Sequence, residues 1–247
     1  MHRFAPITGL PCVVLRELQR RLRTTGPRCG RPWASSLERR LTVVCTSLRT
    51  NLTLRELAAM FDISKSQVHR IVADLVPRLA RLLPSTIDPD HRWSWVVDGT
   101  LIPTRDHQAA AKSKNYRWSC NAQLLVRRRD LRVVAIVGGG PGNRNDPVHY
   151  RGSLVELLCR RHRRVLADGG YRGVTELITP VFRGNRIIRD RVWRRHRKRR
   201  ARVEHAIARL KTWRVLRDHR RKGRNLLHTL QAVAFLHNLV LDMRDSS

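Results

Sequence analysis

Three acidic residues stand in sequence settings where a carboxylate could do chemistry. Asp98 and Asp168 each follow a short apolar run and precede a glycine, in the segments VVDG and LADG. A carboxylate at the end of a strand lies at the rim of a sheet, where α/β folds usually place their sites. Asp-Gly is also common in turns, so either pair alone favours a turn. The chain has only 19 acidic residues, and the two pairs together point to a site.

The third acid, Glu204, lies in a basic segment with helical periodicity. Arg200 precedes it by one helical turn and Lys211 follows it by two, so the three side chains are predicted to share one face. Glu204 is the only acidic residue between Asp190 and Asp218. A salt bridge to the surrounding arginines is the simpler interpretation of Glu204. The alternative is that it joins the two aspartates in one site.

Carboxylates brought together in this way would bind divalent cations. Hard oxygen ligands suit Mg²⁺ or Mn²⁺, and a two-metal site needs a few carboxylates with a phosphate held alongside. One ion would activate a water molecule or a 3′-hydroxyl, and the other would stabilise the leaving oxygen. Arginine and lysine nearby would hold DNA. Asp98, Asp168 and Glu204 are therefore the candidate metal ligands and catalytic residues.

The elements that must position these residues form a mixed α/β sheet with helices. Turn-forming residues at 84–90 predict a boundary, beyond which the pattern changes from helical to strand-like. Residues 101–104 are expected to turn back beside the first strand. Strands are predicted at 93–97, 121–126, 131–137, 165–167 and 187–188, and helices at 148–159, 197–216 and 226–243.

The segment before this boundary predicts a helical, DNA-binding region. After a helix at 37–48, Thr53 and Glu56 form a capping box for a short helix, and Ser64 caps a second helix after a tight turn. This is the helix-turn-helix pattern, although an ordinary helical hairpin gives the same signal. The residues predicted to face DNA are Lys65, Ser66, Gln67, His69 and Arg70.

The charge of the chain indicates a polyanionic partner. Fifty-one Lys and Arg residues against 19 acidic residues give a net charge of +32. Such a balance is typical of proteins that bind nucleic acid. A codon bias toward arginine would explain the preference for Arg over Lys but not the scarcity of acids. Residues 183–224 hold 19 of the basic residues and only three acids, so the charge is concentrated rather than spread over the surface.

Cysteine usage and hydropathy place the chain in a reducing cytoplasm. The five cysteines form no C-x-x-C pair, and their odd number suggests neither a disulfide framework nor a zinc site. The N-terminal segment lacks the pattern of a signal peptide, and no apolar run is expected to span a membrane. We expect a cytoplasmic, nucleoid-associated bacterial protein without a membrane partner.

Three segments together resemble the DDE transposases of IS5-type insertion sequences, including the related PIF/Harbinger-like group. They are WVVDGTLIP around Asp98, VLADGGYRG around Asp168 and RARVEHAIARLKTWRVLR around Glu204. In that family the last segment follows Y-x2-R-x3-E-x6-K, and Arg200, Glu204 and Lys211 fall on this spacing, with Arg197 at the tyrosine position. The resemblance covers roughly residues 90–240.

The resemblance implies an RNase H-like catalytic domain over residues 89–247, preceded by the helix-turn-helix region over 1–88. It implies that Asp98, Asp168 and Glu204 bind two Mg²⁺ ions, with Mn²⁺ as a substitute. The family cuts the terminal inverted repeats of its own element and joins the 3′-hydroxyls to target DNA, as a dimer or larger homo-oligomer. Arg200 and Lys211 are then expected to contact phosphates near the cut.

Two features of the resemblance leave roles open. A Gly…His-Asp element often precedes the second aspartate of the family, and here Asn145 replaces the histidine before Asp146. Asp146 is therefore expected to be a structural or secondary site residue rather than a ligand. Gly169 stands where many relatives carry lysine, and together with Gly170 it is expected to leave room for backbone close to metal and DNA.

Three other interpretations remain at this point. The chain could be a DNA-binding regulator without catalysis, for which the helix-turn-helix and the charge suffice. It could be a metal-dependent nuclease that cuts DNA but does not join it. It could also be an inactive copy of a transposase that still binds the element ends.

Overall fold

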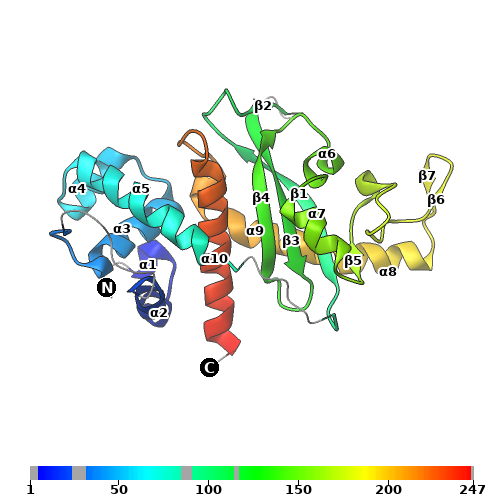
Figure 1. The fold of residues 1–247 in the computed structure, drawn as a ribbon, viewed down its shortest axis with the longest axis horizontal. Helices are drawn as coiled ribbons and strands as arrows, with labels where there is room; N and C mark the ends of the chain where they lie inside the picture. Colours follow the sequence, from blue (N-terminus) through cyan, green and yellow to red (C-terminus); the bar gives the residue numbers. More distant parts are fainter. Residues whose placement is uncertain (1–4, 24–31, 85–90, 114–116, 246–247) are drawn as a thin grey trace.

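The computed structural model describes residues 5–23, 32–84, 91–113 and 117–245. A group of helices comes first in the chain and a mixed α/β sheet follows, as predicted (Figure 1). The predicted boundary between residues 88 and 89 lies outside the described residues and stays a prediction.

The described residues of the first part of the chain form helices joined by short connections, without strands. Its last two helices form the predicted helix-turn-helix. An amphipathic helix that the sequence analysis did not predict buries Leu15, Leu18 and Leu22. The five helices are α1 (Ala5–Thr8), α2 (Cys12–Arg23), α3 (Leu37–Thr50), α4 (Leu54–Phe61) and α5 (Lys65–Arg81).

Capping boxes at both helix starts fix the helix-turn-helix. Thr53 and Glu56 make the predicted box at α4, and Ser64 with Gln67 makes a second one at α5. Between them Asp62 adopts a left-handed conformation with φ of 47°, which ends α4 and turns the chain. Each box satisfies two backbone groups that would otherwise lack partners, so the start of α5 is held firmly.

Five strands form the main sheet, and four of them follow the order β2-β3-β1-β5. The fifth strand, β4, pairs with the same edge of β3 as β2 does, further along β3. β1 and β4 are antiparallel to β3, and β5 is parallel to β1. This is the mixed sheet expected for an RNase H-like fold. The strands are β1 (Trp95–Pro103), β2 (Ala111–Lys112), β3 (Trp118–Arg127), β4 (Val133–Pro141) and β5 (Val165–Leu166).

The first strand differs from the prediction. We expected it to end at Val97 and residues 101–104 to turn back beside it. Instead β1 continues through Asp98 to Pro103, because it pairs with β3 along its whole length, from Trp95 opposite Arg127 to Pro103 opposite Ser119. Asp98 therefore lies within a strand rather than at its end.

The predicted fifth strand at 187–188 is also wrong as a member of the main sheet. Ile187 belongs to a separate hairpin of β6 (Phe182–Arg183) and β7 (Arg186–Ile187). Ile178 takes the place beside β5, through a single parallel bridge to Leu166.

Two predicted helices are interrupted, the first at one place and the second both at Ala201 and after Lys211. The helix at 148–159 is divided around Gly152, whose φ of 71° is left-handed. The helix at 197–216 is divided at Ala201, where the amide of Glu204 bonds to the carbonyl of Ala201 in a tighter turn. The helices are α6 (Asp146–Tyr150), α7 (Leu154–Arg160), α8 (Arg191–Arg200), α9 (Arg202–Lys211), η3 (Arg214–Leu216) and α10 (Asn225–Asp245).

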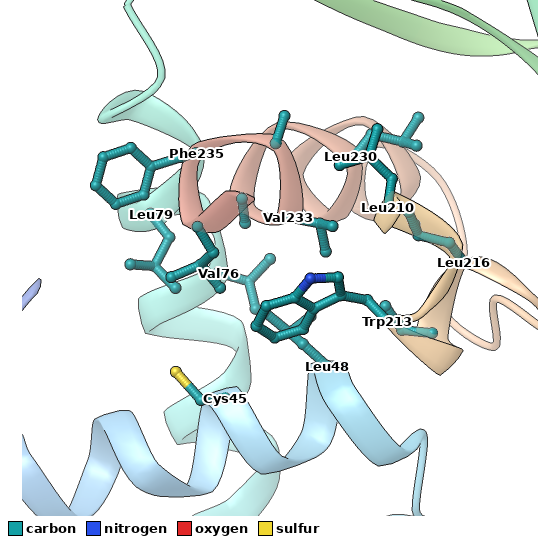
Figure 2. Close-up of a cluster of buried hydrophobic side chains, with 14 of the residues drawn as sticks. Cys45, Leu48, Val76, Leu79, Leu210, Trp213, Leu216, Leu230, Val233 and Phe235 are labelled. Carbon is teal, nitrogen blue, oxygen red and sulfur yellow. The ribbon is translucent and has the colours of Figure 1, made fainter. Parts of the chain in front are cut away.

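Alternating side chains of β1 divide the core between the two faces of the sheet. Trp95 and Val97 pack with α7 on one face, whereas Val96 belongs to the larger core that includes α9, α10 and the N-terminal helices. Helix α10 lies between those helices and the sheet (Figure 1). Trp213 is 5% exposed and points into the cluster of Figure 2, beside Leu48.

Helix α10 corrects the expectation about membrane-spanning segments. Within the described chain it is long and apolar enough to cross a membrane, judged by length and composition alone. However, 67% of that stretch is buried inside the protein, as in the core helix of a folded domain.

Candidate active site

The register of the sheet brings the two aspartates to the same level. β1 and β5 are parallel, with Trp95 opposite Val165 and Val96 opposite Leu166. Asp98 and Asp168 each lie two residues beyond the last of these pairs. Side chains alternate along a strand, and Val96 and Leu166 both face the larger core. The two carboxylates therefore lie on the same side of neighbouring strands.

Asp98 is partly buried, and its electrostatic surroundings are mixed. Burial raises its pKa to about 6 from the usual 3.8, the Arg200 guanidinium opposes this, and the negative charges of Asp168 and Asp146 add to the rise. An acid near other acids in a partly desolvated position is typical of a functional site. The carboxylates of Asp98, Asp168 and Asp146 thus act on one another electrostatically.

The guanidinium of Arg200 connects the first and third predicted acids. Its Nη1 donates to Oδ2 of Asp98 and its Nη2 to Oε1 of Glu204, each at 3.0 Å. The Glu204 side chain remains 61% exposed, whereas that of Asp98 is 14% exposed. The salt bridge predicted for Glu204 is therefore present, and the same arginine places Glu204 next to Asp98.

Asp168 begins a short 3-10 helix, η2 (Gly169–Tyr171), and its Oδ1 accepts a bond of 2.8 Å from the amide of Gly170. The turn interpretation of this Asp-Gly pair is therefore correct. Asp168 both caps this turn and lies beside Asp98. The space at Gly169 is not open as we expected, because a Cβ there would lie 3.1 Å from Phe182 of the β6–β7 hairpin.

Asp146 packs on the backbone of Gly99, where a Cβ would lie only 2.0 Å from Oδ1 of Asp146. Asn121 and Gln123 both donate to that oxygen, at 2.7 and 3.1 Å. The Tyr171 hydroxyl in turn donates to Gln123. The sequence analysis missed this network, although two amide side chains two residues apart in an otherwise apolar strand were a signal for it.

Replacing Gly99 by alanine should disturb this network. The added methyl group would collide with Asp146, so either β1 or α6 must shift. Such overpacking costs about 1–3 kcal/mol of folding stability. Urea unfolding of the Gly99→Ala variant should show a loss of this size. A variant as stable as the wild type would mean that Asp146 can move away without cost.

A groove of about 1030 Å³ opens beside these acids. Asp168 and Asp146 contribute to its wall, together with the cationic side chains of Lys112, Arg144 and Arg151. A groove lined by both acids and cations suits a phosphate chain with a metal ion between it and the acids.

Lys211 does not line this groove. It borders another cavity of about 720 Å³, with Leu101 and Pro103 from the far end of β1. This cavity shares Leu101 and Ser113 with the groove. Burial, and to a smaller extent the charge of Arg217, lowers its pKa. Lys211 and Arg200 are thus both next to β1, but the structure places only Arg200 against the acids.

The predicted DNA-facing residues of α5 lie mainly on its surface. Lys65, Ser66, His69 and Arg70 are exposed. Gln67 is half-buried, and its side-chain oxygen accepts from the amide of Ser64 in the capping box. Gln67 therefore has a structural role, and only its side-chain NH2 group remains available to contact DNA.

Removing the cap of α5 should weaken the helix-turn-helix. Alanine at Ser64 loses the bond from the amide of Gln67, and N-cap substitutions of this kind cost about 1 kcal/mol. Chemical unfolding of Ser64→Ala should show this loss, and exposed Ser66→Ala is the matched control. Equal stability of the two variants would contradict the role of the cap.

The ionisation of Asp98 makes a prediction about stability. The folded protein holds the Asp98 proton more tightly than the unfolded chain does, so it binds more protons between about pH 4 and 6. The free energy of unfolding should therefore fall as the pH rises through this window. The shift corresponds to roughly 3 kcal/mol as an upper bound. In chemical unfolding without metal, Asp98→Asn should be more stable than the wild type at pH 8 but not at pH 4. Equal stability of the two proteins at pH 8 would contradict the raised pKa of Asp98.

The donor chemistry fits a divalent cation, because Asp98, Asp168 and Glu204 offer only carboxylate oxygens. Among the described residues, however, no three acidic, histidine or cysteine side chains are close enough together to hold a metal ion. Arg200 supplies the positive charge between Asp98 and Glu204 in this arrangement.

Two segments of the chain match known families of DNA-processing proteins. Residues 92–239 match the family described as the transposase DDE domain, and residues 36–85 match the helix-turn-helix of DDE superfamily endonucleases. The chain belongs to the DDE transposase family, with a helix-turn-helix DNA-binding region before an RNase H-like catalytic domain.

A relative from Streptomyces albus G is similar over nearly the whole chain. The two sequences are 41% identical over 252 residues, which cover 96% of this chain and 94% of the relative. That protein carries the name "Putative transposase for insertion sequence element IS112". No solved structure matches the chain.

Proposed function

We propose that this transposase is of the IS5 type and that Asp98, Asp168 and Glu204 are its catalytic triad. The observation that supports this most is the parallel register of β1 and β5, which puts Asp98 and Asp168 side by side. Glu204 joins them through the shared guanidinium of Arg200. The reaction is cleavage at the ends of the element and joining of the freed 3′-hydroxyls to target DNA.

The three carboxylates would hold two divalent ions, Mg²⁺ or Mn²⁺. When bound, these ions would supply an activated oxygen nucleophile and stabilise the charge on the leaving oxygen. The chain itself positions Asp168 by its cap on η2 and keeps Asp98 partly out of water. The groove beside Asp168, with Lys112, Arg144 and Arg151, would hold the DNA strand that enters the site.

The other predicted site residues have supporting roles in this proposal. Arg200 contacts a phosphate near the cut as well as the two acids, and Lys211 contacts DNA further along β1. Helix α5 reads the terminal inverted repeats with the exposed residues Lys65, Ser66, His69 and Arg70, and with the amide group of Gln67. The protein acts in the bacterial cytoplasm as a dimer or larger homo-oligomer, because transposition joins two ends.

A cleavage and joining assay tests this proposal. The purified protein, a duplex carrying the element's own end and supercoiled plasmid are incubated with Mg²⁺. Joined products support a transposase, and cut ends without joining would indicate a nuclease only. Binding without chemistry, both here and with Mn²⁺, would leave a DNA-binding regulator or an inactive copy and contradict the proposal.

A further inference from the structure

Residues 181–200 form a basic arm, consisting of the β6–β7 hairpin and α8. This arm holds ten Arg or Lys residues and one acid, Asp190. It projects at the end of the molecule opposite to α4 and α5 (Figure 1). About half of the high local charge that the sequence analysis noted over residues 183–224 thus lies on one protruding element. Of its ten basic residues, Arg200 bonds to two of the proposed triad acids, and neither the triad nor the helix-turn-helix uses the other nine.

Helix α8 separates its anchoring residues from a cationic stripe. Trp193, His196 and Arg200 recur at helical spacing on one side, where Trp193 is half-buried and the His196 ring bonds to the carbonyl of Ile178 at 2.9 Å. The opposite side carries the outer stripe, which we define as Arg191, Arg195 and Lys198. These three residues are four and three positions apart, so they line up along one exposed face.

The outer stripe has no charge partner within the part of the chain that is described. None of its side chains forms an ion pair with a described carboxylate. The single acid of the arm, Asp190, caps α8 by accepting from the amide of Trp193. Three neighbouring cations on a short helix repel one another, and a bound polyanion would relieve that repulsion.

Both ends of the arm contact residues next to or in the proposed triad. Phe182 of the hairpin approaches Gly169, the residue after Asp168. At its other end α8 finishes at Arg200, which bonds to Asp98 and Glu204. An anion held on the arm would therefore have a fixed position relative to the acids.

We infer that the outer stripe of α8 binds the phosphate backbone of the DNA duplex next to the cut, independently of base sequence. Exposed arginine and lysine side chains neutralise phosphates, and contacts to phosphates carry no sequence information. The arm lies far from α5, so the outer stripe binds a part of the duplex that the helix-turn-helix does not contact. This inference rests on the proposed function, because the acids define where the cut occurs.

Salt-dependent DNA binding tests the inference. In the triple variant Arg191→Gln, Arg195→Gln, Lys198→Gln, each lost phosphate contact should reduce the slope of log K against log salt by about 0.9. We expect a slope lower by about 2–3 and binding at least ~10-fold weaker at low salt. The loss should be equal for a duplex with the element's end and for one of unrelated sequence.

The control is Arg16→Gln, Arg23→Gln, Arg244→Gln, which removes the same charge from exposed positions elsewhere. It should keep a slope close to that of the wild type. A wild-type slope in the α8 variant, or equal losses in both variants, would overturn the inference. So would an altered oligomeric state without DNA together with unchanged DNA binding, which would make the stripe a protein contact. Cleavage by the wild type, measured in parallel, reports separately on the proposed function.

Discussion

Asparagine in place of Asp168 is expected to reduce cleavage and joining by roughly 10³-fold or more, the scale seen when one member of a catalytic set is removed. Asparagine keeps the side-chain oxygen that accepts from the amide of Gly170, so η2 should stay capped. Only the charge needed for a divalent ion is lost. The measurement is the single-turnover rate of strand cleavage with Mg²⁺.

A matched control separates this charge from the cap. Asp190 caps α8 in the same way, by accepting from the amide of Trp193 at 2.8 Å. Asp190→Asn should keep cleavage close to the wild-type rate. If Asp168→Asn also cuts and joins at that rate, Asp168 is a turn residue and the proposed triad is wrong.

Alanine in place of Arg200 should slow cleavage by about 100-fold, because one side chain positions Asp98 and Glu204 together. Its charge also opposes the rise in the pKa of Asp98. Without it that pKa should rise further, and the acid limb of the pH–rate profile should move to higher pH. Lysine at this position keeps the positive charge but cannot bond to both acids as the guanidinium does. The pH–rate profile of Arg200→Lys should therefore be close to that of the wild type, whereas its cleavage rate should stay low.

Arg199→Ala is the control for Arg200, since it removes one charge from the neighbouring exposed position of α8. It should leave the pH–rate profile unchanged. If Arg200→Ala slows cleavage but its profile does not move, Arg200 acts only on the DNA. If neither the rate nor the profile changes, the bond between Asp98 and Arg200 has no part in the reaction.

The sequence predicted the helix-turn-helix well, because its signals are local. Thr53, Glu56 and Ser64 form their caps with residues three positions away, and the structure confirms the resulting turn. The family match confirms the DDE domain that the motifs around Asp98, Asp168 and Glu204 indicated.

The errors arise where long-range pairing decides the structure. Polarity changes at Asp98, but backbone pairing with β3 carries β1 on to Pro103. The basic run around Ala201 has uniform helical character, but it is broken into two helices, of which α8 packs against β5 and α9 against β1 and α10. The network of Asp146 with Asn121 and Gln123 joins residues more than 20 positions apart. The two amides in an apolar strand indicate a polar contact, but their partner is not predictable from a local pattern.

The most direct test of the central claim is a strand-transfer measurement with a pre-cut element end. This substrate isolates the joining step, so the outcome does not depend on recognition of an uncut end. The account predicts joined plasmid with Mg²⁺ and none with chelator, and at least ~10³-fold less product from Asp98→Asn, Asp168→Asn and Glu204→Gln. Joining at the wild-type rate by these variants would contradict the assignment of the three carboxylates.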